Sequence, residues 1–219
     1  ISASTVIPTL VAQLTNSPVL VGLAAGLPSG AWLLPQLFVA AWIARFRRKK
    51  PVVVGACFAS RPFFILIGLA VGFFGNSRPG LALAALIICQ VLFYIGDAVA
   101  SVPWFDLFAK TIPPRRRGRV LGVSQITGGI GGILVGIAVR YILGSNGPWP
   151  YPWNYASLFF FAGGILLIGA FLLSQVREEP SELPDDTPPS IGQVLASIPD
   201  ILHNDRPFCL MLVIRLVAG

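Results

Sequence analysis

The sequence predicts an all-α, polytopic membrane protein, and three observations lead to this fold class. Only 11% of the 219 residues are charged, whereas soluble domains carry about 25%. Hydrophobic residues make up 55% of the chain, and the mean hydropathy is +0.77. Several apolar runs reach the roughly 20 residues that a helix needs to cross a bilayer. Because so little polar surface cannot coat a water-soluble globule, we expect a lipid bilayer around the chain.

The apolar runs divide the chain into five complete spans and two partial ones. Residues 1–175 form a predicted N-terminal bundle of six helices, whose first span, 1–14, is truncated. The complete spans are predicted at 19–44, 51–74, 81–109, 119–143 and 155–175. A polar linker follows at 176–206, and residues 207–219 begin a seventh span. Since both chain ends fall inside apolar segments, we expect a piece of a longer protein.

The loops between the spans alternate in positive charge. The loops 45–50, 110–119 and 176–206 together hold twelve Lys and Arg, mostly in the clusters RFRRKKP and PPRRRGR. The intervening loops 15–18, 75–80 and 144–154 together hold one. Loops rich in Lys and Arg stay in the cytoplasm, so we expect the first set to be cytoplasmic. Short loops of this kind are typical of a prokaryotic inner membrane.

The formal net charge of +7 has a topological explanation. In a soluble protein it would suggest a nucleic-acid partner, but no soluble domain is predicted that could present the two basic clusters. We therefore expect topological anchors and no nucleic acid. At the opposite membrane interface the sequence places four aromatic residues, a position that such rings favour. They are Trp149, Tyr151, Trp153 and Tyr155.

Small residues and prolines recur inside the predicted spans. Glycines repeat every four residues at 22–30, 68–72 and 128–136, a spacing that lets membrane helices approach closely. The glycine row of the fifth span also allows a second interpretation, a sliding surface between moving helices. Prolines inside the second and fourth spans remove backbone hydrogen bonds and can kink a helix. In the linker, residues 190–202 place apolar side chains on one helical face, which predicts a helix at the cytoplasmic membrane surface.

Two opposite charges lie deep in neighbouring spans. Arg61 lies about ten residues, or roughly 15 Å, from the cytoplasmic end of the third span, and Asp97 lies roughly 18 Å from that end of the fourth. Charges near the bilayer centre are costly and point to function. The similar depths predict an intramembrane ion pair. Three interpretations stay open: a structural pair, a switch linked to a proton or a substrate, or two side chains that face different directions.

Six spans, a long linker and a further span resemble the first half of a major facilitator superfamily (MFS) transporter. Residues 40–49, AAWIARFRRK, resemble the family's loop motif Gly-x-Leu-x-Asp-Arg-x-Gly-Arg-Lys, with Arg45, Arg48 and Lys49 at its basic positions. Ala44 replaces the motif's Asp, and Arg47 its second Gly. AKTIPPRRRGRVLG at 109–122 and VREEP at 176–180 are also similar to family patterns. GGIGGILVG resembles the antiporter motif but lacks its Pro, so antiport does not follow.

The resemblance implies a latch on the cytoplasmic side, in which the basic loop motif takes part. Because Ala44 replaces the acid of that motif, we hypothesise that Asp106 substitutes for it. Its predicted partners are Arg48, Arg117 or Arg119. The alternative is a solvated acid at the membrane interface. Together with Arg45 and Lys49, these residues are the candidates for a cytoplasmic gate.

The resemblance also implies a central cavity lined by the first and fourth spans. On this chain it points to Gln13, Gln90 and Tyr94, beside Asp97. Gln36 and Gln125 are further polar residues in the second and fifth spans. Polar side chains inside membrane spans also bond to neighbouring helices, so a structural role stays open for each of them.

The predicted function is secondary active transport of a small solute by alternating access, with a coupling proton as a possible partner. The resemblance implies that the missing C-terminal half is needed for it. The alternative is a non-transporting sensor or scaffold on the same fold, because fold does not fix function. An enzyme is not expected, since the chain has a single His, in the linker, and two separated intramembrane acids. We expect neither a metal site nor a cofactor, and the chain carries no P-loop motif.

Overall fold

The structure, a computed structural model, describes residues 6–43, 46–144, 147–178, 192, 209–210 and 213–214. The side chains at positions 34, 37 and 41 are not among those described. Nearly all of the linker and of the predicted seventh span lies outside these residues. The predicted surface helix at 190–202 therefore stays a prediction, as does any role for Arg45.

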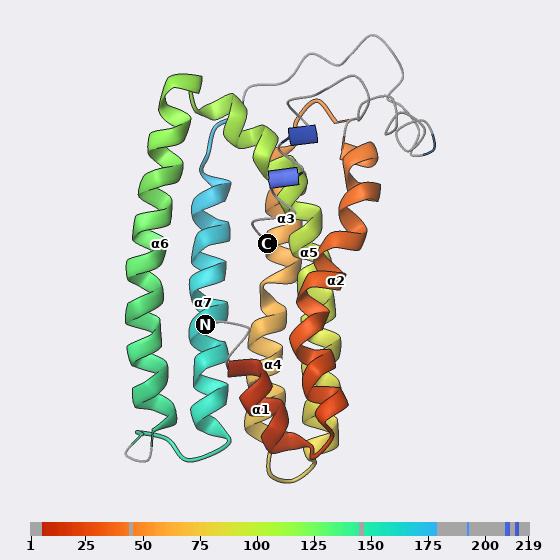
Figure 1. The fold of residues 1–219 in the computed structure, drawn as a ribbon, viewed down its shortest axis with the longest axis vertical. Coiled ribbons are helices and arrows are strands. Elements are labelled where there is room, and N and C mark those ends of the chain that lie inside the picture. The colour runs from red at the N-terminus through yellow and green to blue at the C-terminus, as the bar shows by residue number, and fades with distance from the viewer. Residues whose placement is uncertain are drawn as a thin grey trace.

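The described residues form an all-α bundle, as predicted (Figure 1). Its helices are α1 (Val6–Leu14), α2 (Pro18–Ile43), α3 (Lys50–Ser60), α4 (Pro62–Phe74), α5 (Pro79–Thr111), α6 (Pro114–Leu143) and α7 (Trp153–Ser174). Proline occupies the first turn of α3, α4, α5 and α6, where its missing N–H costs no helical hydrogen bond. Five helical segments are long and apolar enough to span a membrane, and their bounds fall close to the predicted complete spans.

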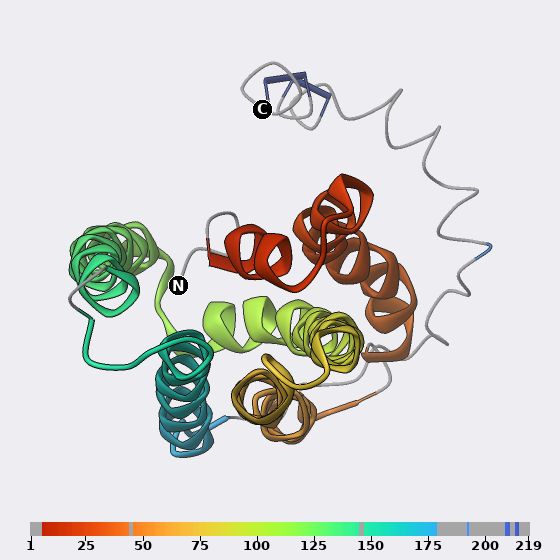
Figure 2. The same cartoon turned by 90° about the horizontal axis from the view of Figure 1, so that it is seen from below.

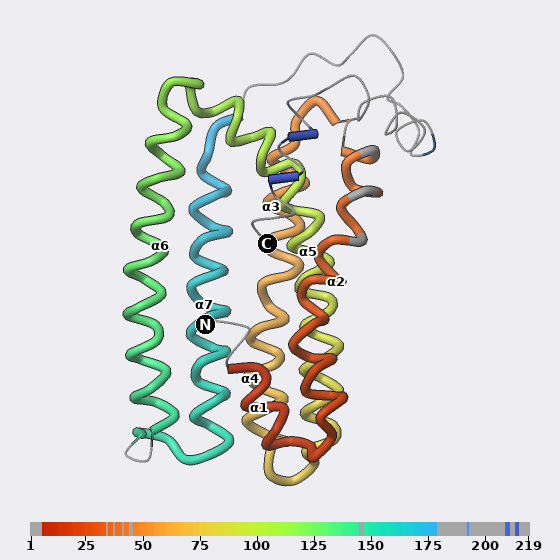
Figure 3. Tube along the Cα trace, viewed as in Figure 1, coloured from red at the N-terminus to blue at the C-terminus, as the bar shows by residue number. Residues whose placement is uncertain are grey.

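The third span is interrupted at its middle, which the sequence analysis missed. It was predicted as continuous over 51–74, but Arg61 separates α3 from α4. The cause is Pro62, whose nitrogen cannot donate the hydrogen bond that would continue the helix. Arg61 keeps right-handed helical backbone angles, and the chain continues from α3 into α4 along one rod (Figure 3). The interruption thus places a charged side chain at a local weak point of a spanning helix.

Two apolar clusters hold the bundle together. The larger one joins α1, α2, α4, α5 and α7, and its fully buried members include Leu10, Ile67, Leu86 and Phe159. A smaller cluster joins α3, α5 and α7 through Val53, Cys57, Ala100 and Ala170. Cluster residues with small side chains, such as the two alanines, leave space between the helices.

Some glycines mark close helix contacts, and others do not. A Cβ added at Gly68 would lie 2.8 Å from the Phe160 ring, and one at Gly72 would lie 3.1 Å from Trp153. The packing interpretation fits this row. The rows at 22–30 and 128–136 face open space in the described part of the chain. They have no packing role among these residues.

Helix α6 lies at the edge of the bundle, beside α7 (Figure 2). None of its residues, all of which are described, is buried. Its apolar side chains include Ile126, Ile133 and Leu134, each more than 60% exposed. This helix therefore lacks protein cover on most of its surface.

The connecting loops gather at opposite ends of the bundle, alternating as predicted. The α1–α2, α4–α5 and α6–α7 connections lie at one end of the bundle. The N-terminal ends of α3 and α6, where the two basic clusters lie in the sequence, are at the other end (Figure 1). Trp149 and Trp153 are exposed near the first of these ends. Tyr155, near the start of α7, is only 5% exposed and packs into the core, so its ring faces neighbouring helices, and its interfacial depth stays a prediction. Its ring packs against Tyr151, whose hydroxyl donates to the carbonyl of Gly75.

Candidate functional site

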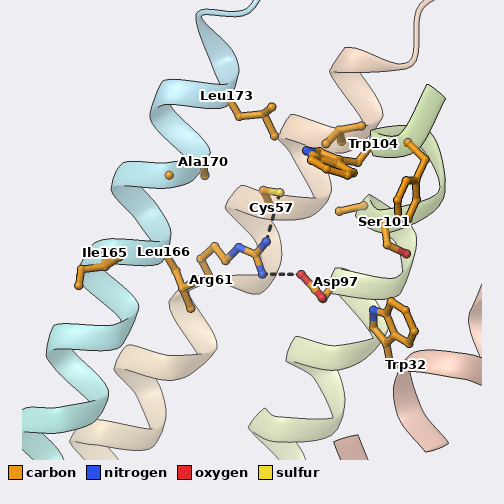
Figure 4. A pocket seen from close by; sticks show the side chains of 14 residues that line it. Trp32, Cys57, Arg61, Asp97, Ser101, Trp104, Ile165, Leu166, Ala170 and Leu173 are labelled. Carbon is orange, nitrogen blue, oxygen red and sulfur yellow. Dashed lines mark hydrogen bonds and ion pairs between the residues drawn. The ribbon is translucent and has the colours of Figure 1, made fainter. Parts of the chain in front are cut away.

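A cavity of about 500 Å³ opens between α3, α5 and α7, with one wall from α2 (Figure 4). It is lined by Trp32, Val53, Cys57, Arg61, Asp97, Ala100, Ser101, Trp104, Phe105, Ile165, Leu166, Gly169, Ala170 and Leu173. The volume falls within the range of small-molecule sites, roughly 300–1,000 Å³. Small side chains on α5 and α7 create the space.

The lining residues follow the helical period on each element. On α3 they are four residues apart, at 53, 57 and 61, and on α5 they fall at 97, 100, 101, 104 and 105. Residues at these spacings share one face of a helix. Each helix thus turns one stripe toward the same space. The spacing is present in the sequence, but it does not show which face of a helix lines a cavity until the neighbouring helices are known.

Arg61 and Asp97 meet inside this cavity. The Arg61 Nη1 lies 2.7 Å from Asp97 Oδ1, the distance of a charge-assisted hydrogen bond. The two side chains come from different spans, 36 positions apart in the sequence. The structure therefore brings together the two charges whose similar depths suggested a pair, and Figure 4 shows them pointing toward one another.

Arg61 is held more firmly than Asp97. Its Nη2 donates to the Cys57 sulfur at 3.6 Å, and its guanidinium carbon lies 5.2 Å from the centre of the Phe93 ring. A cation over an aromatic face is stabilised by the ring's quadrupole. The Arg61 side chain is 14% exposed and the Asp97 side chain 31%. Of the two charges, the carboxylate is the one more open to a ligand.

The other predicted cavity residues do not line this space. Gln90 is buried between helices, where its Nε2 donates to the Ala24 carbonyl of α2 at 3.0 Å. That contact joins two spans, so Gln90 has a structural contact of the kind that was the alternative to a place in the cavity. Gln13 is exposed on α1, and Tyr94 is half-buried with its ring edge-on to Phe93. The predicted central cavity, lined by the first and fourth spans, is a different space from this one, so the roles of Gln13, Gln90 and Tyr94 in it stay predictions.

A second charged cluster lies at the end of the bundle where the basic loops gather. Asp106 Oδ2 lies 2.8 Å from Lys49 Nζ and 2.6 Å from Lys110 Nζ. The predicted partners of Asp106 are therefore wrong among the described residues. The backbone explains this, because Lys49 directly precedes α3, which packs along α5. Asp106 does pair with the basic loop motif, but its partner there is Lys49 and not Arg48.

Of the remaining gate candidates, Arg48, Arg117 and Arg119 lie within the described residues, and none of these three belongs to this cluster. Arg117 donates from Nε and Nη2 to the carbonyls of Ile112 and Ala109, at 3.0 and 2.6 Å. It thus satisfies carbonyls at the C-terminal end of α5. Arg48 and Arg119 are exposed.

Glu178 is the functional candidate that sequence reasoning missed. Its Oε1 accepts from the backbone N–H of Lys49 at 2.8 Å, and its Oε2 from that of Lys50 at 2.9 Å. A carboxylate at a helix N-terminus is stabilised by the free N–H groups and by the helix dipole. Its side chain is only 2% exposed, with Lys110 Nζ 3.9 Å away. VREEP contained this residue, but nothing local showed which helix it would cap.

The described residues contain no group of three or more His, Cys, Asp or Glu that could hold a metal ion. Their charged side chains form two groups of ion pairs: Arg61 with Asp97 inside the bundle, and the Asp106 cluster at its end. The first lies in a cavity and the second ties α3, α5 and α7 together. The first can therefore meet a small molecule, and the second can fix the relative positions of three spans.

Comparison with known proteins adds family evidence to this geometry. The family model of the Major Facilitator Superfamily matches residues 1–219. A D-galactonate transporter from Escherichia coli O6:H1 (strain CFT073) is 26% identical over 166 residues, which cover 72% of this chain and 32% of the relative. The chain thus spans about a third of the length of that relative. No solved structure matches the chain.

Proposed function

The chain belongs to the Major Facilitator Superfamily, and from this premise we propose that it is the N-terminal part of a secondary transporter for a small solute. Transport would proceed by alternating access, as two helical halves rock about a site near the bilayer midplane. The chain supplies one half, and the missing C-terminal half is needed for the activity. The transporter relative in Escherichia coli supports this class of function.

The observation that carries the proposal is the ion pair in the cavity. Arg61 and Asp97 meet deep within spanning helices, next to a space that can take a small molecule. An intramembrane pair costs desolvation, and its attraction only partly offsets that cost. A stable scaffold does not need such a pair, since apolar residues pack as well or better. A transporter needs groups that exchange partners within the membrane.

Asp97 is the group that we propose exchanges partners. Its carboxylate has two oxygens, and Arg61 contacts Oδ1. A solute or a proton at the carboxylate weakens the attraction to Arg61, which lies beside the interruption between α3 and α4. Loss of that attraction would let α3 and α5 shift relative to each other. The pair would thus couple occupancy of the cavity to the arrangement of two spans.

The cluster at the end of the bundle has a different proposed role. Lys49, Asp106, Lys110 and Glu178 all lie in this half of the protein, so their contacts stiffen one half rather than latch two halves together. Of the gate candidates that the structure describes, Arg48 and Arg119 are exposed and remain for contact with the other half. We propose that this end faces the cytoplasm in a prokaryotic inner membrane, which the distribution of Lys and Arg supports.

The test uses the full-length protein, purified in detergent and reconstituted in liposomes. Its melting temperature is screened against sugars, sugar acids, amino acids, nucleosides and organic cations at two pH values. A ligand of the folded state raises the apparent stability. The expected result is a ligand that is also carried into liposomes, with flux lost in Asp97→Asn. A folded protein that binds a ligand but carries none would favour the sensor or scaffold alternative.

A further inference from the structure

We propose that the cavity between α3, α5 and α7 binds an apolar organic cation, with the Asp97 carboxylate as its counter-ion. The inference rests on the proposed function only in making that cation the transported solute. The binding chemistry follows from the cavity itself. Three features carry it: the apolar lining, the unequal exposure of the two charges, and the aromatic rings that share the cavity with the carboxylate.

The lining favours a ligand with an apolar body. Ten of the fourteen lining residues are apolar, and the polar groups are Cys57, Arg61, Asp97 and Ser101. A sugar or a sugar acid would bring several hydroxyl groups into this space. Most of them would lose their water without gaining a partner, and each unpaired polar group costs about 1–3 kcal/mol. An apolar ligand has no hydroxyl groups to desolvate, so it avoids this cost.

The charges favour a cation over an anion. An anion would have to bind Arg61, whose Nη1 and Nη2 already donate to Asp97 and Cys57 and whose carbon lies over the Phe93 ring. Asp97 is about twice as exposed as Arg61. A carboxylate can also accept at both of its oxygens. A ligand in the cavity therefore meets the negative member of the pair more readily than the positive one.

Aromatic rings line the same cavity as this carboxylate. Trp32, Trp104 and Phe105 all belong to its lining, and in the view of Figure 4 the two indole rings lie on either side of Asp97. Tryptophan offers the best π face for a cation, worth about 0.5–2 kcal/mol depending on desolvation. A cavity that is lined by both a carboxylate and indole rings thus suits a hydrophobic cation better than an anion.

The test compares two ions of the same shape and opposite charge. Tetraphenylphosphonium and tetraphenylborate are dialysed against the full-length protein in detergent, and their Kd values are measured. The cation is expected to bind at least about tenfold more tightly than the anion. Asp97→Asn is expected to weaken cation binding by at least about tenfold, while Asp97→Glu keeps it within a few-fold.

A matched pair of arginine variants separates ligand binding from a merely structural role. Arg61→Gln removes the competing cation, so tetraphenylphosphonium binding should be kept or strengthened. Arg78→Gln makes the same change in the exposed loop between α4 and α5 and should leave binding unchanged. If the pair were structural only, Arg61→Gln and Asp97→Asn would weaken binding equally. The melting temperature of each variant shows whether it is folded.

The outcomes distinguish this inference from the proposed function. Equal or tighter binding of tetraphenylborate, or binding of D-galactonate with no binding of the cation, overturns the cation class. Flux of another solute in liposomes would then leave the transport function standing. Cation binding that requires Asp97, without flux of that cation or of any other solute in the panel, supports the site and contradicts transport. Unaltered cation binding in folded Asp97→Asn overturns the site.

Discussion

At the scale of single residues, the unequal environments of Arg61 and Asp97 set the behaviour of the cavity. Besides the carboxylate, Arg61 contacts the Cys57 sulfur and the Phe93 ring. Among the described residues, the Asp97 side chain has no hydrogen bond or ion pair other than the one with Arg61. The two positions should therefore respond differently to substitution, although they form one ion pair.

The first prediction concerns this pair. Asp97→Asn and Arg61→Gln should each lower the free energy of unfolding, by about 1–3 kcal/mol, because one partner of a largely desolvated pair remains. The double variant should lose less than the sum, with a coupling energy of about 0.5–3 kcal/mol. Thermal unfolding of the full-length protein measures all three, with Arg78→Gln as a control. Strict additivity would mean that the pair contributes nothing.

The second prediction concerns Glu178. Glu178→Ala removes both acceptors from the N-terminal end of α3 and should destabilise the protein by about 1 kcal/mol, as loss of a helix cap does. Glu178→Gln keeps an oxygen acceptor but loses the charge, so its effect should be smaller. The melting temperatures of the two variants check this order. Equal effects would assign the whole contribution to charge instead of hydrogen bonding.

At the scale of elements, the crossing of α3 and α5 determines whether the ion pair can form. A Cβ added at Gly96 would lie 2.5 Å from the Cβ of Ser60, a separation that forces the helices apart. Gly96 directly precedes Asp97, and Ser60 directly precedes Arg61. The close approach therefore positions the two charged side chains.

The third prediction tests this crossing. Gly96→Ala should destabilise the protein by about 1–3 kcal/mol, because an extra methyl group is forced into a packed contact, and should weaken ligand binding at Asp97. Adding Ser60→Gly to this variant should restore much of the lost stability and of the lost ligand binding. Gly128→Ala on α6 is the matched control, since nothing lies within 4 Å of the added Cβ. Failure of the rescue would mean that other contacts position the pair.

Much of this architecture was predictable from the sequence, because membrane spans need only length and apolarity. The split of the third span was also within reach, since Pro62 follows Arg61 directly. The partners of Asp106 and the role of Glu178 were not. Both depend on which helix ends lie side by side, and hydropathy contains no information about neighbours. The cavity was missed for the same reason, because most of its lining is apolar.

At the scale of the whole molecule, the bundle has two unlike faces. The cavity opens between α3, α5 and α7, whereas α6 lies at the edge of the bundle with no residue buried in the described structure. The sequence of α6 is rich in glycine and apolar residues. A large apolar surface of this kind needs lipid or another protein segment as cover.

The fourth prediction tests the orientation of the whole molecule. Single cysteines replace Arg116, in the basic cluster, and Asn76, in the loop between α4 and α5, in full-length protein whose other cysteines are serine. In intact cells, a thiol reagent that cannot cross membranes should label position 76 and leave position 116 unlabelled until the cells are opened. The reverse pattern would contradict the positive-inside assignment.

The closeness of Arg61 to Asp97 has an electrical consequence. With both groups charged, the empty cavity contributes no net charge, so in the proposed alternating-access cycle the membrane potential would exert no net force on the pair. A bound monovalent cation changes this, because one charge crossing 100 mV is worth about 2.3 kcal/mol. The loaded carrier would then feel the voltage while the empty one would not. A neutral pair thus makes the occupant, and not the protein, the charge that the membrane potential drives.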